Sequence, residues 1–416
     1  MRSIDRFDEE IAVGYRRVSL LAAGLLLFAT TLALHLRLGA PWALLAAASL
    51  ASAPLFAQYA AENRPYMSWL LLFALTVILA AEAASRPWRE TGRARRGALA
   101  VAAVGLALVA LPGALQAAVG CALCGLSWLR ASQDRRETRA ALASSLLLAA
   151  ACVALGLYFG GRSPCRGYEA GHLALRFPDR VGLLRPVLSL IWGDGVVGGV
   201  GNVFMLLGLV PALRLGQRLL SRAGAVTPRA SFAGWLSTGV GAQLGLTVFL
   251  AGETIHFGYY FVPRVFLHVA VCRALLVALG GWFSWGWLAE RAHAPGRTAL
   301  QTLALGVALL ALAFAFSLER QDVEERRLTS PAAGTGPCDV ASGTLVVDIP
   351  SQTTDWALGP NLIVRLAEDR RRCGARPSGD TRHVLAVGDG AYRISAERAP
   401  GAIPLEQCGR RVVVGP

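Results

Sequence analysis

Five ionisable side chains lie close together in an otherwise apolar stretch of the sequence, "AGETIHFGYYFVPRVFLHVAVCRALL" (251–276). A charged side chain is costly at membrane depth, so such residues by default suggest a functional site. Guanidinium groups pair well with phosphate or carboxylate, and an acid beside them can orient them. The segment therefore predicts a polar pocket at the outer face that binds an anionic or polar headgroup, with Glu253 and Arg264 as its central pair. The five residues are Glu253, His256, Arg264, His268 and Arg273.

Two other interpretations of this segment stay open. Glu253 could pair with an arginine and simply lock two neighbouring helices together. The pair Glu253-x-x-His256 also has the spacing that di-metal helix bundles use. Only one such pair is present, and no second acid is available to complete a metal site. We therefore expect neither a metal nor another cofactor.

The elements that must position these residues are membrane spans. Of the 416 residues, 54% are hydrophobic and only 16% are charged, whereas a soluble domain carries about a quarter charged residues. The net charge of +14 comes from arginines in short clusters between apolar runs. That pattern is typical of the positive-inside rule and not of nucleic-acid binding. The apolar stretch after residue 17 is too long for a cleaved signal and indicates a retained first span.

About ten runs are long and apolar enough to approach the roughly 20 residues that a spanning helix needs. The fourth and fifth are short and meet at "LPGALQ", so they could form a tight hairpin or one broken span. The sequence thus predicts an all-α polytopic membrane protein with about nine to eleven transmembrane helices. The runs are 18–36, 42–60, 67–85, 97–112, 113–130, 140–160, 194–213, 231–250, 265–288 and 298–317.

Arginine in short loops predicts the orientation of these spans. The four arginine-rich loops should be cytoplasmic, which places 161–190, 251–264 and everything after about 318 outside. The N-terminus then also falls outside, although it carries several arginines. This conflict leaves two alternatives, a re-entrant early span or a single crossing at 97–130. The four loops are 85–97, 130–139, 214–229 and 290–297.

The composition changes sharply after residue 320. A polar linker at 321–340 is followed by short strand-like runs such as "GTLVVDIP" and "HVLAVG", which predict a small extracytoplasmic β-rich domain at 341–416. Disulfides persist outside the cytoplasm, so two of the tail cysteines, Cys338, Cys373 and Cys408, are expected to pair. Their connectivity does not follow from the sequence.

Other cysteines lie within apolar runs. Cys121 and Cys124 form a C-x-x-C pair, but a redox site would need solvent access and a βαβ setting. We therefore expect these two residues and Cys152 to be buried small hydrophobes.

Upstream of the ionisable segment, "WGDGVVGGVGNVFMLLGLVPALRLGQRLL" places Asn202 between a run of glycines and an apolar helix. Glycine at membrane depth permits close approach of helices. Asn202 could by itself do no more than make an interhelical hydrogen bond worth about 0.6–2 kcal/mol.

Taken together, residues 150–290 resemble the VanZ-like family. Its members commonly open one helix with Asn, in a pattern that reads like N-h-h-h-F-h-P-h-G, where h is an apolar residue. A Glu ends the next helix, an Arg follows soon after, and an Asp and an Asn open a final glycine-containing helix. The matching residues here are Asn202, Phe204, Gly208, Glu253, His256 in a position that usually holds Gln, Arg264, and Gly280 or Gly281.

This sequence departs from the family pattern at two positions. His268 stands where the family has Asp, and Cys272 where it has Asn. Any family chemistry that needs the second carboxylate is therefore in doubt. The four or five spans before residue 150 and the tail lie outside the resemblance.

The resemblance implies a bacterial inner-membrane protein of the cell envelope, a family in which some relatives affect glycopeptide susceptibility. It brings no agreed reaction, so whether the chain is an enzyme stays open. The expected parts are N-terminal helices at 1–149, the VanZ-like region at 150–290 and a last helix at 291–320. Expected partners are membrane lipids and a cell-envelope glycan or lipid precursor, with no nucleic acid. The oligomeric state is not predicted.

Two enzyme classes remain as alternatives. His268, Cys272 and Arg273 are loosely similar to the Cys, Arg and His set of exosortase-type transpeptidases, and a nucleophilic Cys needs a base nearby. A polytopic transferase of envelope polysaccharide or lipid-linked precursors would instead use a large outer loop. The loop at 161–190 is rich in arginine and contains His172, but it is short.

Overall fold

A computed structural model describes most of the helical part of the chain. It describes the backbone but not the side chains at 9–16 and 253–257. The described ranges are 9–53, 56–60, 66–131, 134–161, 199–209, 227–257 and 266–289, together with Trp192, four residues between 303 and 310, and short strands between 344 and 411.

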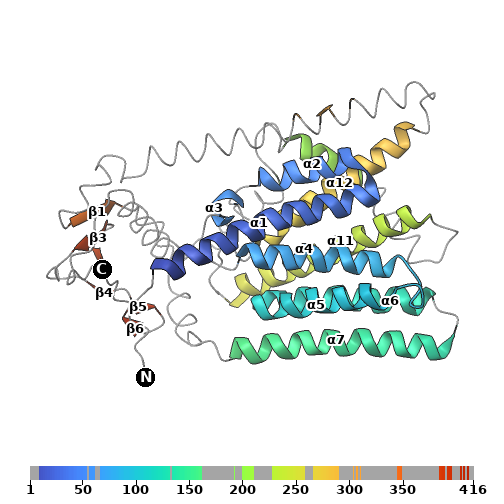
Figure 1. Cartoon of the computed structure of the whole chain (residues 1–416), viewed down its shortest axis with the longest axis horizontal. Helices are drawn as coiled ribbons and strands as arrows, with labels where there is room; N and C mark the ends of the chain where they lie inside the picture. The colour runs from blue at the N-terminus through green and yellow to red at the C-terminus, as the bar shows by residue number, and fades with distance from the viewer. Residues whose placement is uncertain are drawn as a thin grey trace.

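The described helices form one bundle (Figure 1). Six of them are long and apolar enough to cross a membrane, which confirms an all-α polytopic membrane protein. A shorter apolar helix covers Gly199–Leu209. The labelled helices are α1 (Glu9–Leu38), α2 (Ala40–Ala51), α3 (Phe56–Ala60), α4 (Tyr66–Ala84), α5 (Arg93–Val109), α6 (Leu111–Ala131), α7 (Arg135–Gly161), α11 (Pro228–Phe257) and α12 (His268–Ala289).

The run at 42–60, which the sequence predicts as one span, follows the turn between α1 and α2. Gly39 adopts φ 107°, a left-handed conformation that glycine tolerates, and its N–H bonds the carbonyl of His35. Pro41 then starts α2, where its fixed φ suits the first helical turn. The α2 helix has only 12 residues, and the short α3 follows it. The predicted span is therefore two short helices.

The α5 and α6 helices are a tight antiparallel hairpin. The backbone is extended at Ala110, between the end of α5 and the start of α6. A Cβ atom on Gly113 would overlap the carbonyl oxygen of Leu106, so the turn packs too closely for a side chain there. The hairpin interpretation of 97–130 is thus confirmed, and the single broken span is wrong.

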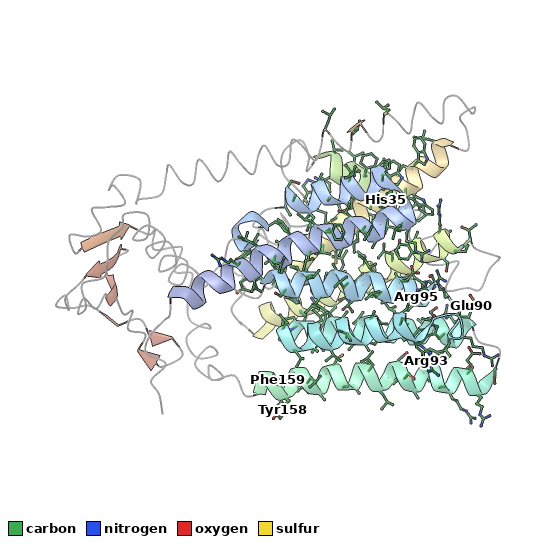
Figure 2. The ribbon with its side chains drawn as sticks, viewed as in Figure 1. His35, Glu90, Arg93, Arg95, Tyr158 and Phe159 are labelled. Carbon is green, nitrogen blue, oxygen red and sulfur yellow. The ribbon has the colours of Figure 1, made fainter. Side chains whose placement is uncertain are left out.

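One end of the bundle is rich in arginine, and Figure 2 labels His35, Arg93 and Arg95 there. Arg89 bonds Asp134 at 3.2 Å, which joins the predicted loops at 85–97 and 130–139. The start of α11 reaches the same end, where the Ser231 hydroxyl donates to the carbonyl of Ser85 at 3.4 Å. We call this the arginine-rich end.

The helices alternate in direction between the arginine-rich end and the opposite end, where Figure 2 labels Tyr158 and Phe159. The α1 helix runs toward the arginine-rich end, and 40–60 return to the opposite end before α4 begins (Figure 1). The α2 and α3 helices thus run back along α1, and neither is by itself long enough to cross a membrane. The start of α1 accordingly lies at the end opposite the arginine-rich one.

The core lies around α4, which contacts α1, α5, α6, α11 and α12. Phe73 and Met67 of this helix are fully buried. The α7 helix lies at the margin, with Leu147 71% exposed. Apolar side chains exposed on the outside of such a bundle are expected to face lipid.

Short strands are described in the tail. Thr344–Asp348, Val384–Gly388 and Ala391–Ser395 form antiparallel β1, β2 and β3, and β4 (Ile403–Pro404) extends the sheet in the order β1-β3-β2-β4. The pair β5 (Glu406–Gln407) and β6 (Arg410–Arg411) is separate. An independent β-rich domain stays a prediction, because these strands alone do not establish a core. The three tail cysteines lie outside the described residues.

Candidate functional site

Arg273 joins three helices inside the bundle. It lies on α12 and is only 2% exposed. Its Nη1 donates to the Ser49 hydroxyl at 3.0 Å and to the Ser49 carbonyl at 3.4 Å. Its Nη2 donates to Oδ1 of Asn202 at 3.5 Å. Since Ser49 is in the last turn of α2, the negative end of that helix dipole also favours the cation.

Glycines make this junction possible. A Cβ atom on Gly201 would lie 2.8 Å from Nη2 of Arg273, so a larger residue would push the guanidinium aside. Two turns further, the Gly199–Leu209 helix packs on α12 with Gly208 against Gly280. A Cβ on Gly280 would overlap the Phe204 carbonyl oxygen. The close approach that the glycines predict is therefore present, and it brings Asn202 to α12.

His268 lies in a different environment on α12. Its Nε2 is 2.7 Å from Oγ1 of Thr247, and that hydroxyl donates to the Gln243 carbonyl at 2.8 Å. Nε2 and Oγ1 therefore share one hydrogen bond, and the tautomer of the ring decides which atom donates. The ring packs against Trp69 and Phe73 at 5.5 and 5.3 Å.

The structure does not bring His268 and Arg273 into one cluster. Five residues separate them, which turns their side chains about 140° apart around the helix. His268 faces α4 and α11, whereas Arg273 faces α2 and the Gly199–Leu209 helix. The two side chains therefore lie on different sides of α12 and do not form one site.

Glu253 lies on a different level of the bundle from Arg273. The Thr247–His268 contact sets the level at which antiparallel α11 and α12 meet. Glu253 lies six residues beyond Thr247 in one direction, and Arg273 lies five residues beyond His268 in the other. Eleven residues at about 1.5 Å each give a separation of about 16 Å along the axis, too far for a direct ion pair.

The outer residues of the predicted pocket are only partly described. Glu253 and His256 lie in the last turns of α11, but their side chains lie outside the described part. Arg264 lies wholly outside it, so its pairing with Glu253 stays a prediction. Within the described residues, no group of three or more His, Cys, Asp or Glu side chains gathers as a metal site would require.

Cys272 is fully buried on α12. A catalytic thiolate needs access to its substrate, so this position does not favour the transpeptidase alternative. Cys121, Cys124 and Cys152 are buried free thiols, which confirms the prediction that they are packed small side chains.

The sequence does not predict two features of this site. The first is a buried amide network: Trp69 Nε1 donates to Gln116 Oε1 at 3.0 Å, and Gln243 Nε2 donates to the Gln116 carbonyl at 2.9 Å. It links α4, α6 and α11, and Thr247 joins it to His268. The sequence feature that could indicate this network is a single glutamine in each of two apolar helices. The second feature is Ser49, which nothing in its neighbourhood distinguishes as an arginine partner.

The described fold and site define a multi-pass membrane protein with a buried arginine junction. No model of a known protein family matches the chain. A search of curated proteins also finds no match. Membership of the VanZ-like family is therefore a proposal.

Proposed function

We propose that this chain is a VanZ-like bacterial inner-membrane protein of the cell envelope. In this proposal it binds the anionic or polar headgroup of a lipid or glycan precursor near its outer face. The observation that carries the proposal is the packing of the Gly199–Leu209 helix on α12, where Asn202 accepts from Arg273 and Gly208 lies against Gly280 two turns further on. Asn202, Gly208 and Gly280 are among the positions on which the resemblance rests.

The chemistry of Arg273 suits such a ligand. A guanidinium presents five N–H donors in a rigid fork that matches carboxylate and phosphate. Ser49 and Asn202 hold this fork in one orientation, and because Arg273 is only 2% exposed, a ligand would have to displace one of them to reach it. Arginine at membrane depth is costly, which favours a binding role over a dispensable one.

The position of the junction supports an outer site. The positive-inside rule would place the arginine-rich end in the cytoplasm. Arg273 is five residues, or about 7.5 Å, from the start of α12 at the other end. Glu253 and His256 end α11 on the same side and could orient the ligand as it enters.

The same orientation would make the tail extracytoplasmic. The described strands lie beyond the end opposite the arginine-rich one (Figure 1). The tail cysteines Cys338, Cys373 and Cys408 would then lie where disulfides persist.

Complementation of a deletion strain tests the proposal. The readout is susceptibility to glycopeptides and detergents, with the protein level in the membrane measured by blot. Arg273→Lys keeps the charge but loses the fork, and Arg139→Lys makes the same change at an exposed arginine of α7. We expect Arg273→Lys to accumulate normally and to fail to complement, while Arg139→Lys complements. Full complementation by Arg273→Lys would overturn the binding role. So would a loss of complementation that is fully explained by a lower level of the variant in the membrane.

A further inference from the structure

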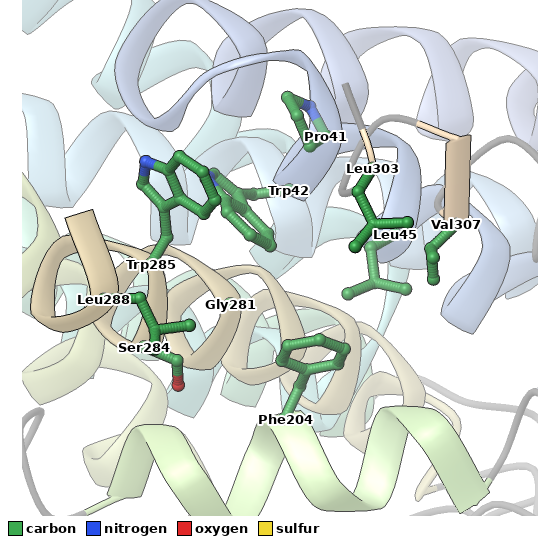
Figure 3. A pocket seen from close by; sticks show the side chains of 10 residues that line it. All are labelled: Pro41, Trp42, Leu45, Phe204, Gly281, Ser284, Trp285, Leu288, Leu303 and Val307. Atoms are coloured by element: carbon green, nitrogen blue, oxygen red, sulfur yellow. The ribbon is translucent and has the colours of Figure 1, made fainter. Parts of the chain in front are cut away.

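A pocket of about 200 Å³ opens at the other end of the same three helices (Figure 3). Leu45 and Trp42 contribute from α2, Phe204 from the Gly199–Leu209 helix, and Gly281 and Trp285 from α12. Trp42 and Pro41 are in the first turn of α2, next to the end of α1. The pocket therefore lies near the arginine-rich end, away from the junction of Arg273.

Aromatic packing gives the pocket fixed walls. The Trp42 ring lies 6.1 Å from that of Trp285 and 6.3 Å from that of Phe204. It also rests on Gly281, where a Cβ atom would overlap the indole. Because three helices hold these rings, the pocket is a built feature of the bundle and not a gap between mobile side chains.

The lining selects an apolar occupant. Ser284 supplies the one side-chain hydroxyl among the lining residues, so ordered water would find few partners. The rim is itself apolar and partly exposed, with Leu303 63% and Leu288 43% exposed. The pocket thus opens onto a surface that faces hydrocarbon in a membrane.

Basic side chains are exposed at the end of the bundle where the pocket opens. His35, Arg93 and Arg95 lie at the same end of the bundle (Figure 2). All three are exposed. Anionic phospholipid headgroups collect near such residues at a membrane surface. A pocket one to two helical turns below that surface lies where the acyl chains of those lipids begin.

We propose that this pocket binds one acyl chain of an anionic phospholipid from the leaflet at the arginine-rich end. The headgroup lies at the basic surface, and the chain lies against Trp42, Phe204 and Trp285. This site is separate from the proposed outer headgroup site, and either can fail without the other.

Photolabelling of the purified full-length chain tests this site. The protein is reconstituted in vesicles that contain phosphatidylglycerol with a diazirine near the start of one acyl chain, and labelled peptides are mapped after irradiation. Ser284→Phe fills the pocket from α12. Ser144→Phe makes the same change on the exposed face of α7 and serves as the matched control.

We expect wild-type labelling of the α2 and α12 peptides to exceed that of α7 peptides. Ser284→Phe should reduce it to the α7 level, while Ser144→Phe leaves it unchanged. Equal labelling of all peptides, labelling that persists in Ser284→Phe, or cross-links to a second copy of the chain would overturn the proposal. If Ser284→Phe does not accumulate, Ser284→Leu and competition by unlabelled phosphatidylglycerol give the same readout.

Discussion

At the scale of single residues, the charged and polar groups of this bundle are stabilised by partners distant in sequence. Arg273 and Ser49 are bonded across 224 positions, and Trp69 and Gln116 across 47. The sequence identifies Arg273, because an arginine in an apolar run is conspicuous. It does not identify Ser49, since serine is common in membrane helices and its role depends on where α2 ends.

Gly280→Ala should destabilise the bundle because the added methyl group would overlap the Phe204 carbonyl. Overpacking of this kind costs about 1–3 kcal/mol. Gly286→Ala is the matched control on the same helix, where nothing lies within 4 Å of the added Cβ. Thermal unfolding in detergent should show a clear loss for Gly280→Ala alone. Similar melting temperatures for the two variants would show that the helices do not cross here.

Thr247→Val should remove the hydrogen-bond partner of His268 Nε2 while keeping the side-chain shape. A buried polar group left without its partner costs about 1–3 kcal/mol. Thr238→Val, on the same helix, removes only a bond to the backbone of Gly234. Chemical denaturation should therefore show a larger loss of unfolding free energy for Thr247→Val. Equal losses would argue against the His268–Thr247 bond.

At the scale of elements, the helices are predicted well wherever hydropathy alone decides them. The runs at 67–85 and 231–250 correspond to α4 and to most of α11. The run at 42–60 fails because apolar composition cannot register the short length of α2, which ends at Ala51. The hairpin at Ala110 stayed ambiguous for the same reason, since its packing against Leu106 is a tertiary contact.

Glu82 joins the ends of three helices and is only 13% exposed. It pairs with Arg37 from α1 and with Arg86 at 3.3 Å, and Arg95 of α5 lies 4.0 Å away. Glu82→Gln should cost about 1–3 kcal/mol, because it leaves partly buried guanidinium groups without their carboxylate. Glu90→Gln, at an exposed position of the same end, is the control. A thermal shift of the same size in both variants would contradict this role.

At the scale of the whole molecule, two of the four arginine-rich loops lie together as the sequence predicts. Contacts from Arg89 to Asp134 and from Ser231 to Ser85 confirm that the loops at 85–97 and 130–139 share one end, where α11 also begins. The direction of α1 places its start at the opposite end of the bundle. The arginines near the N-terminus therefore still conflict with the positive-inside rule. Hydropathy and charge thus specify which ends are shared, while the side of the membrane needs an experiment.

Cysteine accessibility should settle the orientation. We expect Tyr158→Cys to react with a membrane-impermeant maleimide in intact cells, and Glu90→Cys to react only after permeabilisation. Both positions lie near helix ends, at opposite ends of the bundle (Figure 2). Cys165, Cys338, Cys373 and Cys408 would be replaced by serine to remove background. The reverse pattern would place the arginine-rich end outside and overturn the proposed outer site.

The most direct test of the central claim is binding of an anionic headgroup at Arg273. Purified wild type, Arg273→Lys and Arg139→Lys would be titrated in nanodiscs with a polyprenyl phosphate, and bound lipid counted by native mass spectrometry. We expect saturable binding of at least one polyprenyl phosphate to wild type and Arg139→Lys, and its loss in Arg273→Lys. Equal binding by all three proteins, or no saturable binding by wild type, would contradict it.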